Sequence, residues 1–319
     1  MVSGIKDGGG TVLGPVKNYR PATCYPFPAG GIKIKKQPEK IIKKGRLYMQ
    51  YKDQSAWRDV LEFPIGGRQQ KPRRTGKTMV IDKGLGLTEF KDLLEVAAPY
   101  IDFIKLGFGT SVFYPADILR EKIRLARSHA VDIFPGGTFF EVAVLQGRLS
   151  LYLQTARELG YTFIEISDGT IDLSRTLRYA ALRQARAAGF GVITEVGKKD
   201  PRDALSDTHI LSQIAMDLEA GADYVIVEGR ESGQGVVIYD SRGAVKEDTL
   251  AYLIEGIGDL DRIIWEAPQK QQQQTLIINL GANVNLGNVQ PGDVLALEAL
   301  RVGLRGDTLR TTLVREGVI

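Results

Sequence analysis

From Thr78 onward the chain repeats one pattern eight times: a short apolar run, then a segment with apolar residues three and four positions apart. Short runs that are apolar throughout are typical of strands buried on both faces, and the three-and-four spacing is typical of helices. The predicted strands are residues 78–83, 103–107, 132–135, 163–167, 191–196, 224–228, 262–266 and 283–286. Eight strand–helix units over roughly 240 residues predict an α/β fold, a (β/α)8 TIM barrel.

The ends of two predicted helices are marked by their flanking residues. Ser174 is expected to cap a helix that Gly189 stops, and a second helix over 207–220 ends at Gly221. A doubly wound open sheet is the main competing fold. It would normally show a glycine-rich phosphate turn after its first strand, where this chain has Asp82-Lys83-Gly84.

The first 76 residues form an irregular, basic N-terminal extension, which leaves 77–319 for the catalytic barrel. The extension carries a net charge of +11 and the remainder −7, within a total of +4. A basic arm is compatible with nucleic acid or an anionic surface, and also with a solvated arm or one packed on an acidic neighbouring subunit. The absence of aromatic interleaving favours the last two, so no nucleic-acid partner is expected.

Composition limits the remaining classes. No run approaches the roughly 18 apolar residues that span a bilayer, and the first ten residues lack the apolar stretch of a secretory signal, so no membrane partner is expected. The single cysteine, Cys24, suits a reducing cytoplasm. With His129 and His209 as the only histidines, any metal is expected to have oxygen ligands.

Charged residues recur where the predicted strands end, which is where barrels of this kind have their active sites. Lys105 and Glu165 lie inside apolar runs, and a buried charge is costly unless it is paired or used. The other polar residues near strand ends include Asp82, Lys83, Glu141, Ser167, Glu195, Lys198, Lys199, Glu228, Arg230, Ser232, Glu266, Asn285 and Asn288. Structural ion pairs across the barrel mouth could explain any one of them, but not a charged group at nearly every strand end.

The signs of these charges indicate the ligands. Several Lys and Arg at one mouth suit a substrate with multiple negative charges, and carboxylates beside them would repel it unless a divalent cation bridges the two. Mg²⁺ is the expected cofactor, because it takes oxygen ligands and keeps some waters. Arg301 and Arg305 are predicted to bind phosphate or carboxylate, although Arg301 could equally be a helix C-terminal dipole partner.

Two further sequence features indicate no function. Gly76-Lys77-Thr78 resembles the tail of a phosphate-binding loop, but the required earlier glycine is Lys71 and a strand follows. The tract Gln271–Gln274 is expected to be the polar face of a helix start.

Several of these segments together resemble the phosphosulfolactate synthase family. They are IDKGL (81–85), KLGFGTS (105–111), PGGTFFE (135–141), EISDG (165–169), EVGKK (195–199), ADYVIVEGRES (222–232), EAPQK (266–270) and LRGDT (304–308). The resemblance covers about residues 78–308. It departs from the family pattern at Phe108, where Trp is expected, and at Val302, where Arg is expected. It implies Mg²⁺-dependent addition of sulfite to phosphoenolpyruvate, giving (2R)-2-phospho-3-sulfolactate, an early step towards coenzyme M.

Roles follow for the residues at the strand ends. Lys199 is predicted to protonate the carbon next to the one sulfite attacks, with its pKa lowered by neighbouring cations, and Lys198 is the fallback. Glu165, Glu195 and Glu228 are predicted to bind the metal, directly or through water. The anions are expected to contact Lys83, Lys105, Arg230, Ser232, Asn285, Arg301 and Arg305.

Two alternatives remain open at this point. A Schiff-base aldolase acting on a phosphorylated keto acid would use Lys105 or Lys199 as its nucleophile. A non-catalytic, stress-related homologue is the second, although the intact strand ends at 82–84 and 195–199 favour an enzyme. A homo-oligomer, a trimer by family analogy, is expected.

Overall fold

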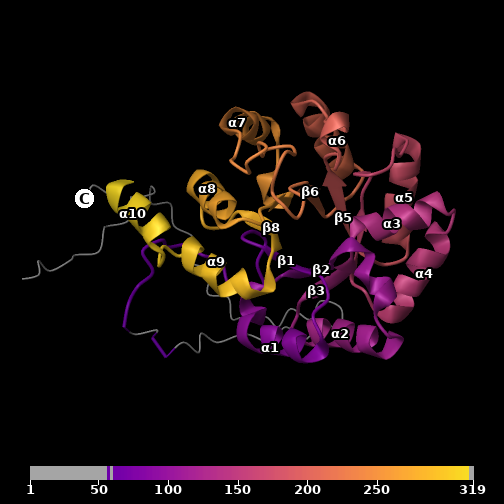
Figure 1. Cartoon of the computed structure of the whole chain (residues 1–319), viewed down its shortest axis with the longest axis horizontal. Coiled ribbons are helices and arrows are strands. Elements are labelled where there is room, and N and C mark those ends of the chain that lie inside the picture. The colour runs from indigo at the N-terminus through magenta and orange to yellow at the C-terminus, as the bar shows by residue number, and fades with distance from the viewer. Residues whose placement is uncertain (1–55, 58–59, 316–319) are drawn as a thin grey trace, which may run out of the picture. The chain divides into compact units, whose positions relative to one another are not determined.

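The eight apolar runs form one sheet of eight parallel strands (Figure 1). The strands are β1 Thr78–Asp82, β2 Phe103–Leu106, β3 Asp132–Pro135, β4 Phe163–Ile166, β5 Gly191–Val196, β6 Tyr224–Val227, β7 Ile263–Glu266 and β8 Asn285–Val289. Their order is β3-β2-β1-β8-β7-β6-β5-β4, and a single backbone bond, Thr162 N to Ile133 O at 3.1 Å, links the two ends. The sheet is therefore a nearly closed barrel, and the predicted fold is confirmed. This computed structural model describes residues 56–57 and 60–315.

Helices surround the strands as an outer ring (Figure 1). They are α1 Leu87–Ala97, α2 Ala116–Ser128, α3 Gly137–Leu145, α4 Leu149–Leu159, α5 Arg175–Ala187, α6 Asp207–Glu219, α7 Glu247–Gly256, α8 Lys270–Leu280, α9 Val294–Arg301 and α10 Gly306–Arg315, with short 3-10 turns η1 Ala98–Tyr100, η2 Gly107–Phe113, η3 Pro201–Asp203, η4 Leu260–Arg262 and η5 Pro291–Asp293. Within the described part of the chain, none of these helices combines the length and the apolarity needed to cross a membrane.

The helix ends follow from their sequences. Ser174 Oγ accepts a hydrogen bond from Leu177 N at 3.3 Å, so the predicted cap of α5 is confirmed. Gly189 and Gly221 have φ angles of 88° and 100°, a left-handed conformation that favours glycine just beyond a helix.

The strands bury two apolar layers. Inside the barrel, six side chains fill the space towards the amino-terminal ends of the strands: Met79, Phe103, Phe134, Ile193, Ile226 and Ile264. A larger core lies between the strands and the ring of helices. Side chains two residues apart along a strand point to the same face. Lys105, two residues after Phe103, and Glu195, two residues after Ile193, therefore also point into the barrel, nearer the carboxyl ends of the strands.

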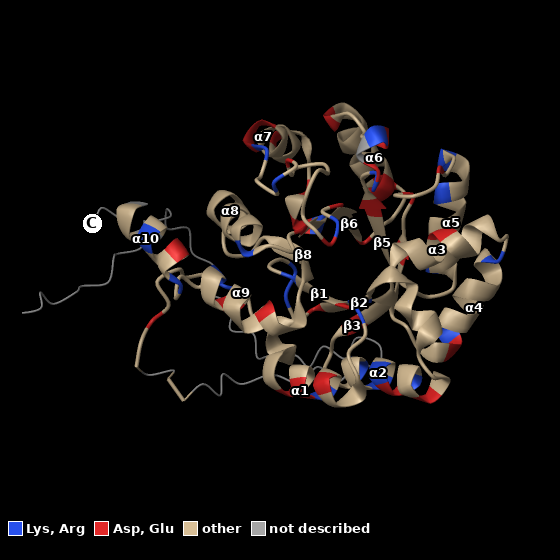
Figure 2. Cartoon of the chain, in the orientation of Figure 1, with Lys and Arg blue, Asp and Glu red and all other residues tan. Residues whose placement is uncertain are grey.

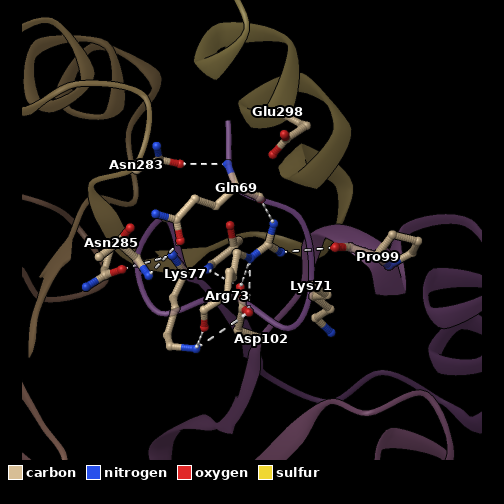
Figure 3. Close-up of polar contacts among 12 residues, drawn as sticks. Gln69, Lys71, Arg73, Lys77, Pro99, Asp102, Asn283, Asn285 and Glu298 are labelled. Carbon is tan, nitrogen blue, oxygen red and sulfur yellow. Dashed lines mark hydrogen bonds and ion pairs between the residues drawn. The ribbon is translucent and has the colours of Figure 1, made fainter. Parts of the chain in front are cut away.

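A polar network closes the amino-terminal end of the barrel (Figure 3). Arg73 Nε lies 3.0 Å from Asp102 Oδ2, and its Nη2 donates to Pro99 O at 3.0 Å. Arg68 pairs with Glu298 at 2.8 Å, and Lys71 donates to the carbonyls of Ala98 and Ala130. Residues 68–77, which the sequence placed in the extension or at its boundary, thus contact the barrel directly. The predictions for Cys24 and for the arm up to residue 55 lie outside the described residues.

Two predicted substrate-binding residues belong to this end of the barrel and not to the active-site rim. Strand β8 begins at Asn285, two residues later than predicted, so Asn285 Nδ2 donates to Asp261 O and Ile263 O at the start of β7. Arg301 is fully buried, and its guanidinium donates to Ala282 O, Val284 O and Lys77 O. The predicted position of both residues at the mouth is wrong, because these carbonyls lie before the strands or at their first residue.

Candidate active site

Four carboxylates converge at the carboxyl-terminal ends of adjacent strands. Glu165 is on β4, Glu195 on β5 and Glu266 on β7, and Glu228 directly follows β6. All four are at most 2% exposed. Figure 2 shows basic and acidic positions side by side on the central strands. Buried carboxylates need a counter-charge, so the question is which cations lie among them.

Lys105 of β2 is the cation at the centre of the four. Its Nζ lies 3.1 Å from Glu165 Oε1, 3.2 Å from Glu195 Oε2 and 3.2 Å from Glu266 Oε1. Burial alone would lower the pKa of Lys105, but the surrounding carboxylates, Glu165 first, raise it well above its usual value. Lys105 is therefore protonated at neutral pH, and the predicted meeting of Lys105, Glu165 and Glu195 at the mouth is observed.

Lys199 is a second cation, closer to the open side of the centre. Its Nζ lies 3.1 Å from Thr138 Oγ1, 3.5 Å from Glu195 Oε1 and 3.8 Å from Glu141 Oε1. Burial favours a lower pKa for Lys199, but the charges of Glu195 and Glu228 outweigh it and raise the pKa above the ordinary value. The predicted lowering is wrong, because the nearest charges are carboxylates and not cations.

The four carboxylates differ in their protonation. Burial raises the pKa of Glu165 to about 8 and raises that of Glu228 well above its usual range. Glu195 is also buried, but Lys199 and Lys105 hold its pKa well below the usual range. Glu195 thus favours its charged form, while burial favours the neutral form of Glu165 and Glu228.

Three of the carboxylates could hold a cation. Glu195, Glu228 and Glu266 each offer an oxygen, and the three oxygens lie within 4.8 Å of one another. Within the described residues, Glu228 Oε2 and Asn288 Oδ1 are buried without a hydrogen-bond partner. An unpartnered buried oxygen on Glu228, a member of the triad, fits a site that accepts a cation or a hydrogen-bond donor.

Two of the three predicted metal ligands, Glu195 and Glu228, belong to this triad, and the third, Glu165, shares Lys105 with Glu195 and Glu266. Glu165 Oε1 contacts Lys105 and accepts from Gly137 N at 3.0 Å, while its Oε2 is buried without a hydrogen-bond partner in the described part of the chain. Glu266 also ends a strand and was visible in the sequence, but only the barrel's curvature reveals which three strand ends face one another.

A serine missed as a functional candidate links the centre to α3. Ser167 Oγ lies 2.7 Å from Glu141 Oε1 and 2.9 Å from Glu195 Oε1. Glu141 Oε2 accepts from Thr170 N at 3.0 Å. These bonds fix the orientation of Glu195, which holds both lysines. The sequence showed Ser167 and Glu141 near strand ends, but it could not show which side chains they contact.

The remaining predicted site residues lie around the rim, some paired with other groups and some exposed. Lys198 Nζ donates to Asp168 O at 2.8 Å and to Ile171 O at 2.9 Å, so it holds a loop. Lys83 pairs with Glu231 at 2.6 Å. Arg230 and Ser232 are exposed on the loop after β6, and no other described residue bonds the guanidinium of Arg230.

Arg305 is not brought to the centre by any contact in the described chain. Its Nε lies 3.8 Å from Asp307, which is itself paired with Lys270 at 2.6 Å. Its predicted role in anion binding stays a prediction.

A parallel eight-stranded barrel whose buried lysines and carboxylates meet at the carboxyl ends of its strands defines a (β/α)8-barrel enzyme. Residues 66–307 match the family model described as (2R)-phospho-3-sulfolactate synthase (ComA). The chain belongs to this phosphosulfolactate synthase family.

Relatives in other organisms agree with this assignment. The chain is 45% identical over 253 residues to a phosphosulfolactate synthase of Methanothermobacter thermautotrophicus, covering 79% of this chain and 98% of the relative. It is 41% identical over 250 residues to one of Bacillus subtilis, covering 78% and 97%. Among solved structures, 3-hexulose-6-phosphate synthase of Salmonella typhimurium is similar with a TM-score of 0.46 at 15% identity, over 75% of this chain and 99% of that one.

Proposed function

We propose that the protein adds sulfite to phosphoenolpyruvate, forming (2R)-2-phospho-3-sulfolactate, as the name of its relatives implies. The observation that carries this proposal is the single centre in which Lys105 and Lys199 share Glu195. Such a centre combines fixed positive charge with carboxylates, which suits an anionic substrate brought to a cation.

The reaction requires stabilisation of one negative intermediate. Sulfite forms a carbon–sulfur bond to the methylene carbon of phosphoenolpyruvate, and the displaced electron pair moves into the carboxylate, which becomes an aci-carboxylate. A proton then adds to the adjacent carbon. Lys105 and Lys199 would place positive charge next to the developing anion, and Arg230 at the rim is available to the phosphate or the sulfite.

Mg²⁺ is proposed as the cofactor, held by Glu195, Glu228 and Glu266. Its support is the 4.8 Å grouping of their oxygens and the unpartnered Glu228 Oε2. When bound, Mg²⁺ supplies Lewis-acid stabilisation of substrate oxygens. Oxygen-only ligands of this kind favour Mg²⁺ over softer metals.

Lys199 is proposed as the proton donor. Its raised pKa keeps it protonated at neutral pH, which is the form a general acid needs. Its side chain is 29% exposed, whereas that of Lys105 is 10% exposed, so Lys199 is the lysine open to a substrate. Protonation from one fixed side would set the configuration of the product.

The protonation of the two lysines argues against the Schiff-base aldolase. A lysine nucleophile must lose its proton to attack a carbonyl, and carboxylates around Lys105 and Lys199 oppose this loss. Borohydride with pyruvate or a similar keto acid is therefore expected to leave the mass of the protein unchanged.

Product analysis tests the proposal. Purified protein with phosphoenolpyruvate, sulfite and MgCl2 is expected to give a new ³¹P resonance and the adduct mass, and excess EDTA is expected to stop the reaction. Lys199→Met should reduce kcat by at least 100-fold, which mutations of a general acid typically cost. Absence of the adduct from the wild-type protein, with phosphoenolpyruvate recovered intact, would overturn the proposed function.

A further inference from the structure

The loop between β6 and α7 begins directly after Glu228 and carries Arg230 and Ser232. It contains no helix or strand, and its only ladder is an isolated bridge between Tyr239 and Val245. A loop of this length next to an active site is usually either a mobile lid or a segment fixed by its neighbours. The contacts of this loop distinguish the two.

The backbone of the loop adopts conformations that need external support. Arg230 has a φ angle of 60° and Val237 one of 32°, although neither is glycine. Left-handed backbone at non-glycine residues costs on the order of 1–3 kcal/mol each and persists where the surroundings enforce it. The contacts that enforce it here come from β7, α8 and β8.

Gln272, in the first turn of α8, makes the central contact. Its Nε2 donates to Gly233 O at 2.7 Å and to Gly243 O at 3.0 Å, and its Oε1 accepts from Gln269 N at 3.1 Å. Gln272 is 1% exposed, so its amide has no water to replace these partners. One side chain thereby joins two points of the loop that are ten residues apart in sequence.

Gly233 and Gly243 lie against the side chains of Gln272 and Gln269. A Cβ atom at Gly233 would lie 2.5 Å from Gln272 Nε2, and one at Gly243 would lie 2.9 Å from Gln269 Nε2. Gln269 Nε2 also donates to Ser232 O at 2.6 Å. The loop backbone therefore lies directly against the amide groups of these two glutamines, at glycines whose φ angles of 65° and 86° are in the left-handed region that favours glycine.

The start of the loop is held from the strands. Gly229 N donates to Glu266 Oε2 at 3.0 Å, Arg230 N donates to Glu228 Oε1 at 2.6 Å, and Asn288 Nδ2 donates to Arg230 O at 3.3 Å. The position of Arg230 is thus coupled to the carboxylate centre on one side. On the other side, Gln269 and Gln272 bind the carbonyls of Ser232 and Gly233, two and three residues further along the loop.

We propose that Gln272 is a positioning residue, which fixes the β6–α7 loop so that Arg230 and Ser232 face the anionic substrate. The loop is then a preorganised wall of the site and not a lid. This role rests on the proposed function in taking phosphoenolpyruvate as the anion. It also gives a reason for glutamine within the tract 271–274, which the sequence predicted to be the polar face of a helix start. The helix α8 does begin at Lys270, but Gln272 and Gln273 are buried.

Gln272→Met tests the proposal, because methionine keeps the length and removes both donors. We expect hydrogen exchange in peptides covering 229–245 to accelerate by at least tenfold and KM for phosphoenolpyruvate to rise by about tenfold, with kcat changed less. Gln271→Met is the matched control: Gln271 is the neighbouring residue, is exposed, and should show neither effect. A loss of stability alone would lower the folded fraction without raising KM.

A second variant keeps the test decisive if Gln272→Met does not fold. Gln272→Glu retains the length and the oxygen that accepts from Gln269 N, but it places oxygen against the two loop carbonyls, so the same changes are expected. Wild-type exchange in 229–245 together with wild-type KM in either folded variant would overturn the proposal. If the wild-type protein forms no adduct, the proposed function fails, while the exchange comparison still decides whether Gln272 holds the loop.

Discussion

At the scale of single residues, the sequence identified the charged positions but not their partners. Lys105 and Glu165 stood out because each interrupts an apolar run, and they do meet at 3.1 Å. The direction of the Lys199 pKa shift could not be predicted, because it depends on which side chains surround the ammonium group in space. Which three carboxylates bring their oxygens within 4.8 Å of one another likewise depends on the order in which the strands close.

Removing the buried lysine tests the electrostatics of the centre. Lys105→Met leaves three buried carboxylates without their shared counter-charge, so the free energy of unfolding should fall by about 3–5 kcal/mol. Urea denaturation monitored by circular dichroism measures this change. Lys91→Met is the control, since Lys91 pairs with Glu95 on the exposed face of α1 and should not shift the midpoint. Equal stability of Lys105→Met and wild type would refute the account of the centre.

At the scale of elements, strand and helix positions were largely predictable because both follow local periodicity. Seven strands match their predicted ranges to within one residue at each end. The exception is β8, where Asn283, Asn285 and Asn288 punctuate a short run and give no local sign of which asparagine starts the strand. That shift of two residues moved Asn285 from the predicted mouth to the opposite end.

The cap of α5 provides a test at this scale. Ser174→Ala removes the acceptor of Leu177 N and should cost about 1 kcal/mol of unfolding free energy. Ser174→Asp restores a capping oxygen and should recover most of that loss. Thermal unfolding by calorimetry would measure both variants. If alanine and aspartate proved equally destabilising, the bond would not be what stabilises the helix end.

At the scale of the whole molecule, the barrel separates stability from chemistry. The carboxylate centre lies at the carboxyl ends of the strands, while Arg73, Lys77 and Asp102 form a network at the amino ends (Figure 3). The sequence could predict the first end from charges that follow strands. It could not predict the second, because Arg68 and Arg73 precede the repeating pattern and look like part of a basic arm.

This separation predicts a variant that weakens the fold and spares the activity. Arg73→Met breaks a buried pair with Asp102 and should lower the unfolding free energy by about 3–5 kcal/mol. At a temperature where the variant stays folded, its kcat and KM should equal those of the wild type. Arg74→Met, at the exposed neighbouring position, should alter neither stability nor kinetics. A raised KM in Arg73→Met would show that the two ends are coupled.

We propose that Glu195, Glu228 and Glu266 hold a divalent cation in the carboxylate centre. Crystals grown with Mn²⁺ in place of Mg²⁺ and measured for anomalous scattering test this directly. The predicted result is one strong anomalous peak within coordination distance of all three carboxylates, and none in crystals of Glu228→Gln. A peak elsewhere in the wild-type protein, or no peak at saturating Mn²⁺, would contradict the account.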